Sequence, residues 1–112
     1  MSAITTHVLD TSQGKPASGV PVTLELRTGQ LGSAIEWTQL GLGKTDADGR
    51  LRTLLPADKK LKPGVYRITF DTTNVSSFYP CVKVVFEIQS PGEHYHIPLL
   101  ISPYGYSTYR GS

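Results

Sequence analysis

The sequence predicts an all-β domain over residues 1–112, a sandwich of about eight strands. Short runs of alternating apolar and polar residues recur along the chain, and Gly, Pro and Asp separate them at intervals typical of a sandwich. Little of the chain shows the 3.6-residue periodicity of a helix. A chain of 112 residues has the length of one domain with a modest core, and small β domains often gain stability by self-association.

The first half of the chain is expected to contribute four strands. Val22, Leu24 and Leu26 alternate with polar residues, which is the pattern of a half-buried strand. Asp46 to Gly49 predicts a tight turn, because aspartate side chains bond the backbone there and Gly49 can adopt a positive φ. The expected elements are strands over Ile4–Asp10, Val22–Arg27, Ile35–Leu40 and Leu51–Leu55, a turn over Gly14–Gly19 and a loop over Gly29–Ala34.

The second half is expected to hold four more strands after a basic connector. One of them is apolar on its odd-numbered face, which suits either the core or an interface between chains. Pro98 lies inside that run, and because proline has no N–H to donate, its nitrogen should face away from a paired neighbour or sit at a bulge. The expected strands are Val65–Asp71, Val82–Ile88, Tyr95–Ile101 and Tyr104–Arg110, and the connector is Asp58–Gly64.

Composition argues against several classes of protein. The net charge of +2 is nearly balanced, so neither a nucleic-acid partner nor a polybasic membrane contact is expected. No apolar run approaches the roughly 20 residues of a membrane-spanning helix. The N-terminus shows no signal peptide, and Arg110-Gly111-Ser112 is not the peroxisomal Ser-Lys-Leu address. Cys81, the single cysteine, excludes an internal disulfide and is expected to be a packed thiol. We expect a cytoplasmic location, or a peroxisomal one if a leader has been removed.

Three residues are the main candidates for chemistry: His7, Arg50 and His96. Neutral imidazole, with a usual pKa of about 6.5, is suited to activating water at neutral pH. Guanidinium is planar, permanently charged and able to bond two oxygens in parallel, so Arg50 can bind an anion or stabilise a developing oxyanion. Each residue also has a structural interpretation: His7 as a half-buried histidine, His94 and His96 as a polar edge pair, and Arg50 as a solvated turn cation.

A metal site is a further interpretation of the histidines. His94 and His96 lie two positions apart and would share one face of a strand, and with His7 they resemble a three-histidine zinc constellation. The sequence shows no nucleophile elbow, cysteine–histidine signature, phosphate loop or dinucleotide fingerprint. The residues by themselves therefore indicate a β-sandwich with histidine, arginine and hydroxyl groups, and they name no substrate.

Several motifs follow one another in a characteristic order along most of the chain. They are Thr5-Thr6-His7-Val8-Leu9-Asp10, Thr45-Asp46-Ala47-Asp48-Gly49-Arg50, Pro63-Gly64-Val65-Tyr66, Ser77-Phe78-Tyr79-Pro80, and His94-Tyr95-His96-Ile97-Pro98-Leu99-Leu100 with a terminal Tyr109-Arg110-Gly111-Ser112. In this combination, and most specifically at its C-terminal end, the chain resembles the 5-hydroxyisourate hydrolases, the purine-degrading branch of the transthyretin-like family. The resemblance implies a transthyretin-like β-sandwich.

The resemblance also implies an activity, a site and an assembly. Family members hydrolyse an amide bond in the six-membered ring of 5-hydroxyisourate, without metal or cofactor, and form 2-oxo-4-hydroxy-4-carboxy-5-ureidoimidazoline. They are homotetramers with active sites where two dimers meet. Carried over by motif, the catalytic residues are His7, Arg50, His96 and Ser112. The substrate-binding residues implied are His7, Arg50, Tyr109, Arg110, Gly111 and Ser112, with a structural carboxylate pair as the alternative for Arg110.

One departure and one rival accompany the resemblance. Family members usually carry a short helix after the strand that corresponds to Val65–Asp71, but only residues 72–77 separate that strand from Phe78, so we expect the helix to be missing. The rival is transthyretin proper, a carrier of thyroid hormone that shares the stretch Leu99–Thr108. A carrier continues beyond this stretch and lacks the set of His7, Arg50 and His96, so hydrolysis is the predicted function.

Overall fold

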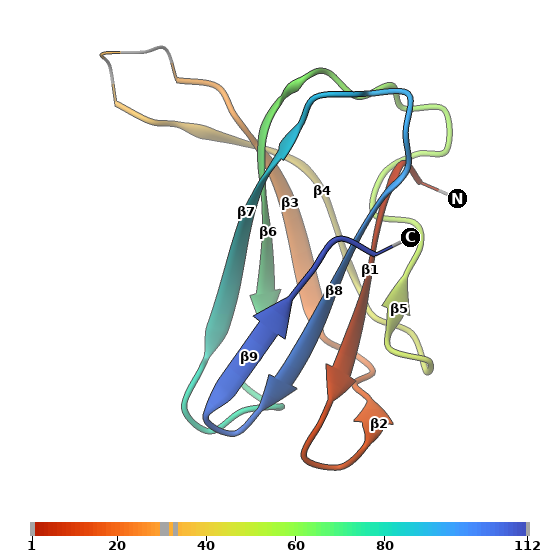
Figure 1. Ribbon diagram of the computed structural model, residues 1–112, viewed down its shortest axis with the longest axis vertical. Helices are drawn as coiled ribbons and strands as arrows, with labels where there is room; N and C mark the ends of the chain where they lie inside the picture. The colour runs from red at the N-terminus through yellow and green to blue at the C-terminus, as the bar shows by residue number, and fades with distance from the viewer. Residues whose placement is uncertain (1, 30–31, 33, 112) are drawn as a thin grey trace.

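A computed structural model describes residues 2–29, 32 and 34–111, and its strands form two sheets packed face to face (Figure 1). One sheet has the order β2-β1-β8-β9, with β5 also paired to β1, and the other has the order β4-β3-β6-β7. The strands are β1 (Ile4–Asp10), β2 (Lys15–Pro16), β3 (Pro21–Arg27), β4 (Trp37–Lys44), β5 (Arg50–Leu51), β6 (Gly64–Asp71), β7 (Cys81–Ile88), β8 (Tyr95–Ser102) and β9 (Gly105–Thr108). The predicted all-β sandwich is confirmed.

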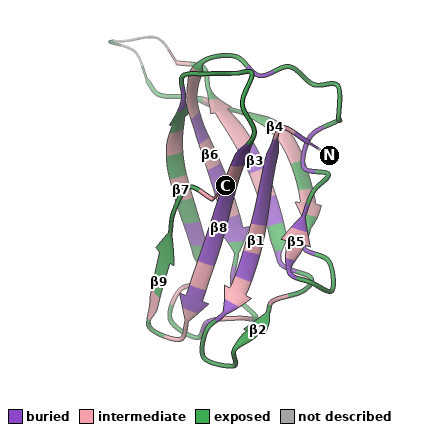
Figure 2. Ribbon diagram, turned by 45° about the vertical axis from the view of Figure 1, so that its right-hand side comes forward, coloured by how far each residue is buried: buried purple, intermediate pink, exposed green. Residues whose placement is uncertain are grey.

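The core lies between the two sheets, where the central strands are buried along much of their length (Figure 2). Alternate residues of each strand supply it, because successive side chains of a strand point to opposite faces. Tyr95 and Leu99 of β8 point inward, so the apolar odd-numbered face of this strand belongs to the core and not to an interface. Each large apolar side chain buried in this way contributes about 1.5–3 kcal/mol to folding.

Strand β1 is the centre of the first sheet and brings distant parts of the sequence together. It runs parallel to β8, with Thr5 opposite His96 and His7 opposite Pro98. On its other side it pairs antiparallel with β5, where His7 lies opposite Arg50. Residues directly opposite each other share one face of a sheet. The outer face of this sheet therefore carries residues from three adjacent strands.

Pro98 interrupts the pairing between β8 and the C-terminal segment. The ladder ends with Leu99 opposite Thr108, and it resumes at one isolated bridge in which the Gly111 N–H donates to the His96 carbonyl at 2.8 Å. By this register, Pro98 turns its nitrogen toward Tyr109, where it has no hydrogen to donate. The strand predicted over Tyr104–Arg110 is for this reason reduced to Gly105–Thr108.

Strand β4 was predicted with the wrong bounds. It begins at Trp37 and continues to Lys44, beyond the expected Ile35–Leu40, because Gly41 and Gly43 are part of it. A glycine inside a strand often marks the close approach of another backbone. Here the carbonyl oxygen of Leu54 lies 2.0 Å from the point that a Cβ on Gly41 would occupy.

The strand predicted over Leu51–Leu55 is also largely wrong. Only Arg50 and Leu51 pair, as β5, and the chain then leaves the sheet. Leu54 and Leu55 are nevertheless buried, with 2% and 3% of their surface exposed. These two leucines pack into the core although they lie in a loop. A pattern of apolar residues alone cannot distinguish such a loop from a strand.

The connection between β6 and β7 contains no helix, as expected. Residues 72–77 form a turn in which the Thr72 carbonyl accepts the N–H groups of Val75 and Ser76 at 3.0 Å. Cys81, at the start of β7, is exposed and not packed as predicted, because the next residue, Val82, takes the inward position. Among the described residues, no helix is long and apolar enough to span a membrane.

Candidate functional site

Arg50 is placed by the tight turn that precedes it. The Asp46 carboxylate accepts the N–H groups of Asp48 and Arg50 at 2.8 and 3.0 Å. Both bonds lower the pKa of Asp46, and the bond from Arg50 has the larger effect. Gly49 has a φ of 73°, and a Cβ there would lie 2.5 Å from the carbonyl oxygen of Val8. The turn therefore needs glycine at this position, and it sets Arg50 opposite His7 on the outer face of the sheet.

His7 is oriented by the same turn. Its Nε2 lies 3.0 Å from the backbone carbonyl oxygen of Asp48. A carbonyl oxygen only accepts hydrogen bonds, so Nε2 must carry the proton and donate it. In the neutral ring Nδ1 then holds the free lone pair, which makes Nδ1 the basic nitrogen of His7.

His96 is held on two sides. Its Nδ1 lies 2.8 Å from the hydroxyl oxygen of Thr5, on the neighbouring β1. Gly111 packs so closely against the ring that a Cβ there would lie 2.5 Å from Cδ2 of His96. With Nδ1 on Thr5 and the Cγ–Cδ2 edge against Gly111, the Cε1–Nε2 edge is the part of the ring that remains free for a ligand.

The electrostatics favour neutral histidines at this face. Burial, followed by the positive charge of Arg50, lowers the pKa of His7 below its usual 6.5. The same two causes, in the same order, lower the pKa of His96. Two neutral imidazoles beside a permanent cation form an arrangement that can activate water next to a bound anion.

The C-terminal residues of the predicted site separate into different positions. The register that joins Gly111 to His96 also places Tyr109 on the outer face, opposite Pro98, with 58% of its surface exposed. Ser112 lies outside the described residues.

Arg110 is turned away from the histidines, toward Glu93 and Tyr95, and its predicted part in substrate binding stays a prediction. Its guanidinium lies 3.4 Å from the Glu93 carboxylate and 4.4 Å from the centre of the Tyr95 ring. Successive residues of an extended segment point to opposite faces, so Arg110 and Gly111 cannot both face His96. The alternative, in which Arg110 pairs with a carboxylate, describes its contacts.

Sequence reasoning missed two residues that touch the histidines. Thr5 bonds His96, and it also lies 3.1 Å from Nε2 of His94. The sequence pattern does indicate the position of Thr5. On a strand, Thr5 and His7 are two positions apart and therefore lie on the same face. The carbonyl of Asp48 had no signal, since backbone groups carry no sequence information.

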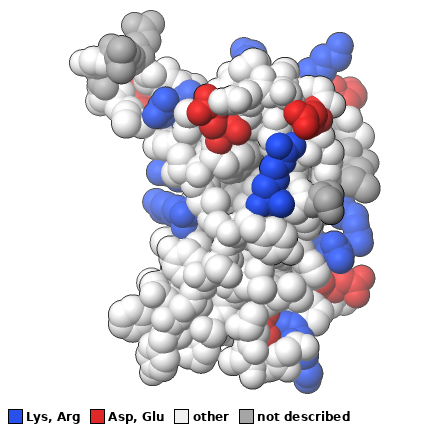
Figure 3. All heavy atoms as spheres, viewed as in Figure 1, with Lys and Arg blue, Asp and Glu red and all other residues white. Residues whose placement is uncertain are grey.

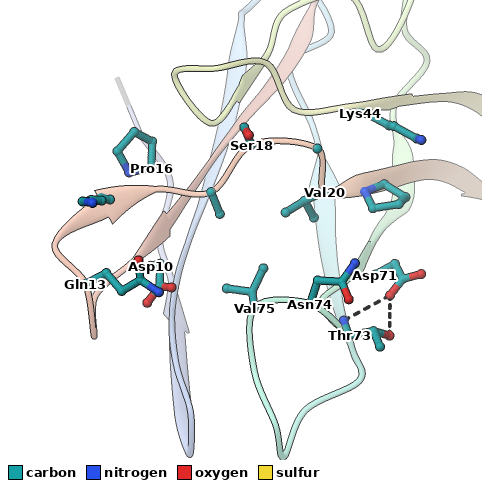
Figure 4. Close-up of a pocket in the computed structure, with 14 residues that line it drawn as sticks. Asp10, Gln13, Pro16, Ser18, Val20, Lys44, Asp71, Thr73, Asn74 and Val75 are labelled. Carbon is teal, nitrogen blue, oxygen red and sulfur yellow. Dashed lines mark hydrogen bonds between the residues drawn. The ribbon is translucent and has the colours of Figure 1, made fainter.

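The described residues form no metal-binding cluster at this face, and one cavity of the molecule lies elsewhere. Across the part of the chain that the structure describes, no three His, Cys, Asp or Glu side chains are grouped to hold a metal ion. A cavity of about 500 Å³ lies instead between the β1–β2 turn and the turn after β6 (Figure 4). Asp71, on its wall, bonds the backbone and hydroxyl of Thr73, so it caps a turn. None of the predicted site residues lines this cavity.

Comparison with known proteins identifies the family. The profile of the HIUase/Transthyretin family matches residues 4–111. The 5-hydroxyisourate hydrolase of Caulobacter vibrioides is 43% identical over 122 aligned positions that cover all of both chains. The chain is also 45% identical to the uric acid degradation bifunctional protein TTL of Arabidopsis thaliana, of which it spans 37%.

Solved structures agree with this assignment. The 5-hydroxyisourate hydrolase of Klebsiella pneumoniae superposes with a TM-score of 0.78 at 36% identity, over all of both chains. Sea bream transthyretin, solved in complex with thyroxine, superposes with a TM-score of 0.84 at 32% identity, over 97% of this chain and 94% of that one. The matched profile, the sequence identities and the shared fold lead to one conclusion: the chain belongs to the HIUase/transthyretin family.

Proposed function

We infer that this protein hydrolyses 5-hydroxyisourate. The observation that carries the inference is the placement of His7, Arg50 and His96 on one face of adjacent strands, where both imidazoles are kept neutral beside a guanidinium. Relatives at 43–46% identity over nearly the whole chain bear the name 5-hydroxyisourate hydrolase. Neutral imidazole can take a proton from the attacking water, and guanidinium can stabilise the negative charge that develops on the carbonyl oxygen.

For the mechanism, we propose that His7 and His96 act on the attacking water through Nδ1 and Nε2. The water oxygen bonds to the ring carbonyl carbon, and one imidazole takes the water proton. The carbon–nitrogen bond then breaks, and the same proton passes to the departing nitrogen, which yields 2-oxo-4-hydroxy-4-carboxy-5-ureidoimidazoline. Arg50 binds the anionic substrate and stabilises the oxyanion as it develops. No covalent intermediate with the protein is needed.

Three C-terminal residues have supporting roles in this proposal. Tyr109, exposed on the same face as Gly111, positions the ring of the substrate. For Ser112, the contribution of a hydroxyl and a terminal carboxylate stays a prediction from the sequence motif. Gly111 contributes by its lack of a side chain, which leaves room for the His96 ring.

The rival function, binding of thyroid hormone without catalysis, fits the backbone equally well. The thyroxine-bound sea bream transthyretin superposes even more closely than the Klebsiella hydrolase, at 0.84 against 0.78. A shared fold does not decide between a carrier and an enzyme, because function depends on the side chains of the site. The polar set of His7, Arg50 and His96 favours hydrolysis.

We propose that the protein assembles as a homotetramer, with active sites where two dimers meet. Four features of the described residues support self-association. The outer face that carries the histidines also exposes part of Leu9 and Leu100. β7 and β9 are free sheet edges, and aromatic rings are exposed at Phe78 and Tyr104. The lower half of the surface in Figure 3, over β9, is largely uncharged. Sedimentation should give one species of four chains, and a monomer would contradict the assembly.

We also propose a cytoplasmic location. The single cysteine, Cys81, is an exposed free thiol, which persists in a reducing compartment. Fractionation of cells that express the full protein would test this, and recovery of the protein outside the cytoplasm would contradict it.

The decisive experiment follows the ultraviolet decay of 5-hydroxyisourate, generated in place by urate oxidase. Addition of the protein should accelerate this decay, and a chelator such as EDTA should leave the acceleration unchanged. Loss of the acceleration with chelator would contradict the metal-free mechanism and restore the three-histidine metal site. Absence of acceleration by correctly folded protein would favour the binding function instead.

The pH dependence of kcat/KM is expected to follow the two histidines. Burial is the larger cause and the positive charge of Arg50 the second, and together they lower the pKa of both His7 and His96 below 6.5. The active, neutral forms are therefore fully populated at neutral pH, and kcat/KM should stay flat there and fall only on acidification, with a midpoint below about 6.5. A profile that falls from pH 8 toward pH 7 would contradict neutral histidines as the active forms.

Stability should follow the same histidines. The unfolded chain binds protons at a higher pH than the folded one, so the stabilisation is fully present above about pH 6.5 and is lost as the pH falls toward the folded-state pKa values. Unfolding by denaturant at several pH values measures this loss, and a free energy of unfolding that rises below pH 6.5 would contradict it.

Replacing Gly111 by Ala should lower kcat/KM by about 10- to 100-fold, because a displacement near 1 Å in a catalytic group has effects of this size. The added methyl would lie 2.5 Å from Cδ2 of His96, so the ring must move. Gly92→Ala is the matched control, since a Cβ at Gly92 meets nothing within 4 Å. Wild-type kcat/KM in G111A would contradict the placement of His96.

A further inference from the structure

The hydroxyl of Thr5 lies between two histidines. Its Oγ1 is 2.8 Å from Nδ1 of His96 and 3.1 Å from Nε2 of His94. The two rings are nearly parallel, with an angle of 18° and centroids 6.5 Å apart. Thr5 is buried, with 4% of its surface exposed, whereas His94 is exposed to solvent. One buried hydroxyl thus connects a surface histidine to a histidine of the site.

A hydroxyl has one hydrogen, so the two contacts cannot both be donated by Thr5. In one direction, Nδ1–H of His96 donates to Thr5, and the Thr5 hydroxyl donates to Nε2 of His94. In the other direction, Nε2–H of His94 donates to Thr5, and Thr5 donates to Nδ1 of His96. These are the two directions in which Thr5 donates to one histidine and accepts from the other.

The direction decides which nitrogen of His96 is basic. In the first direction Nδ1 carries the proton, and Nε2, the nitrogen left free for a ligand, holds a lone pair. In the second direction the neutral ring carries its proton on Nε2 and cannot accept one there. Only the first direction makes His96 a base toward a water molecule at the site.

The charges around His96 favour the first direction. Besides burial, which is the largest influence, and a backbone hydrogen bond to Thr5, the groups that act on it are Arg50 from β5, His7 from β1 and His94 from the segment before β8. Arg110, the charged residue next to Gly111, is turned to Glu93 and Tyr95. The fixed positive charge of Arg50 on this face favours a lone pair over an N–H at the free nitrogen of His96.

We propose that Thr5 and His94 are positioning residues that hold His96 in the Nδ1–H form, so that Nε2 is its basic nitrogen. A His94 ring with its proton on Nδ1 accepts the Thr5 hydroxyl at Nε2, and Thr5 then accepts Nδ1–H of His96. The surface histidine in this way positions the proton of the site histidine through one hydroxyl. The effect on rate rests on the proposed hydrolysis, but the state of the ring does not.

Nitrogen-15 NMR of the histidine rings tests the proposal directly in the full chain. At a pH where all three histidines are neutral, Nδ1 of His96 should give a protonated, pyrrole-type signal and Nε2 an unprotonated, pyridine-type signal. A neutral His96 that carries its proton on Nε2 in the wild-type protein would overturn the proposal.

Two substitutions of Thr5 form a matched pair for the same measurement. Thr5→Val keeps the branched shape that suits a strand but removes the hydroxyl, so His96 should lose its preference for the Nδ1–H form. Thr5→Ser keeps the hydroxyl and should keep the wild-type signals. Thermal unfolding shows whether each variant is folded. An unchanged His96 spectrum in folded T5V would overturn the role of Thr5.

Kinetics supply the second readout. T5V should lower kcat/KM for 5-hydroxyisourate by about 5- to 10-fold, the equivalent of one hydrogen bond, and should change the shape of the acid limb. T5S should restore both. If T5V is folded and has the wild-type pH profile, the proposal fails. If the wild-type protein is inactive but its spectra are as expected, the proposed hydrolysis fails and the control of His96 stands.

Discussion

Replacing His7 by Asn is expected to lower kcat by about 10²- to 10⁴-fold, the range that a general base contributes. The Asp48 carbonyl holds the proton of His7 on Nε2, which leaves Nδ1 as the basic nitrogen beside Arg50. Asparagine has no group that takes a proton near neutral pH, so the variant should bind substrate but fail to activate water. Steady-state kinetics on freshly generated 5-hydroxyisourate measures the loss.

A second substitution distinguishes the role of His7 as a base from its role in holding the turn through the Asp48 carbonyl. In His7→Gln the amide nitrogen can reach the position of Nε2 and keep the bond to the Asp48 carbonyl, but it offers no basic nitrogen. Both variants should therefore lose activity to a similar extent while unfolding near the wild-type temperature. Retention of wild-type kcat by H7Q would show that His7 serves only to hold the turn, and the role assigned to it would be wrong.

Removing the charge of Arg50 is expected to have the second large effect. Arg50→Gln should lower kcat/KM by about 10²- to 10³-fold, the size of effect seen when one oxyanion-stabilising group is removed. The loss should appear in kcat as well as in KM, because the proposed cation acts on both the bound anion and the developing oxyanion. If only KM rises in R50Q, Arg50 binds the substrate and does not stabilise the transition state.

Two companion variants sharpen this result. Arg50→Lys keeps a positive charge but loses the planar pair of donors, so KM should rise more than kcat falls. Arg27→Gln removes an equal charge from an exposed position at the end of β3, in the other sheet, and should leave kcat/KM unchanged. A similar loss in R27Q would mean that overall charge, and not the placement of Arg50, determines the rate.

Most of the fold could be predicted because the buried strands carry their own pattern. Val22 and Leu24 alternate with polar residues, and both are buried in the core. The predictions failed where pairing depends on a distant segment. Gly41 can lie in β4 because the backbone of Leu54 passes close to it. Strand β9 ends at Thr108 because the next residue, Tyr109, lies opposite Pro98. Alternation within one run contains no information about either neighbour.

The candidate site could be predicted by residue type and motif but not by orientation. His7, Arg50 and His96 were expected together, and the structure places them on one face of adjacent strands. Arg110 was expected with them and lies with Glu93 instead, because one residue along an extended chain reverses the direction of a side chain. Thr5 was not expected at all, since its role depends on two rings about 90 residues away.

The amino-acid sequence alone thus determined the class of fold, most of the strands, the family motifs and the kinds of group that carry the chemistry. These properties depend on local periodicity and on residue identity, which are readable along the chain. Only the tertiary structure decided which nitrogen of His7 is basic, which side of the sheet Arg110 faces, and that Thr5 joins His94 to His96. Those features arise from contacts between segments far apart in sequence, and a hydrogen bond exists only once the fold has brought its two partners together.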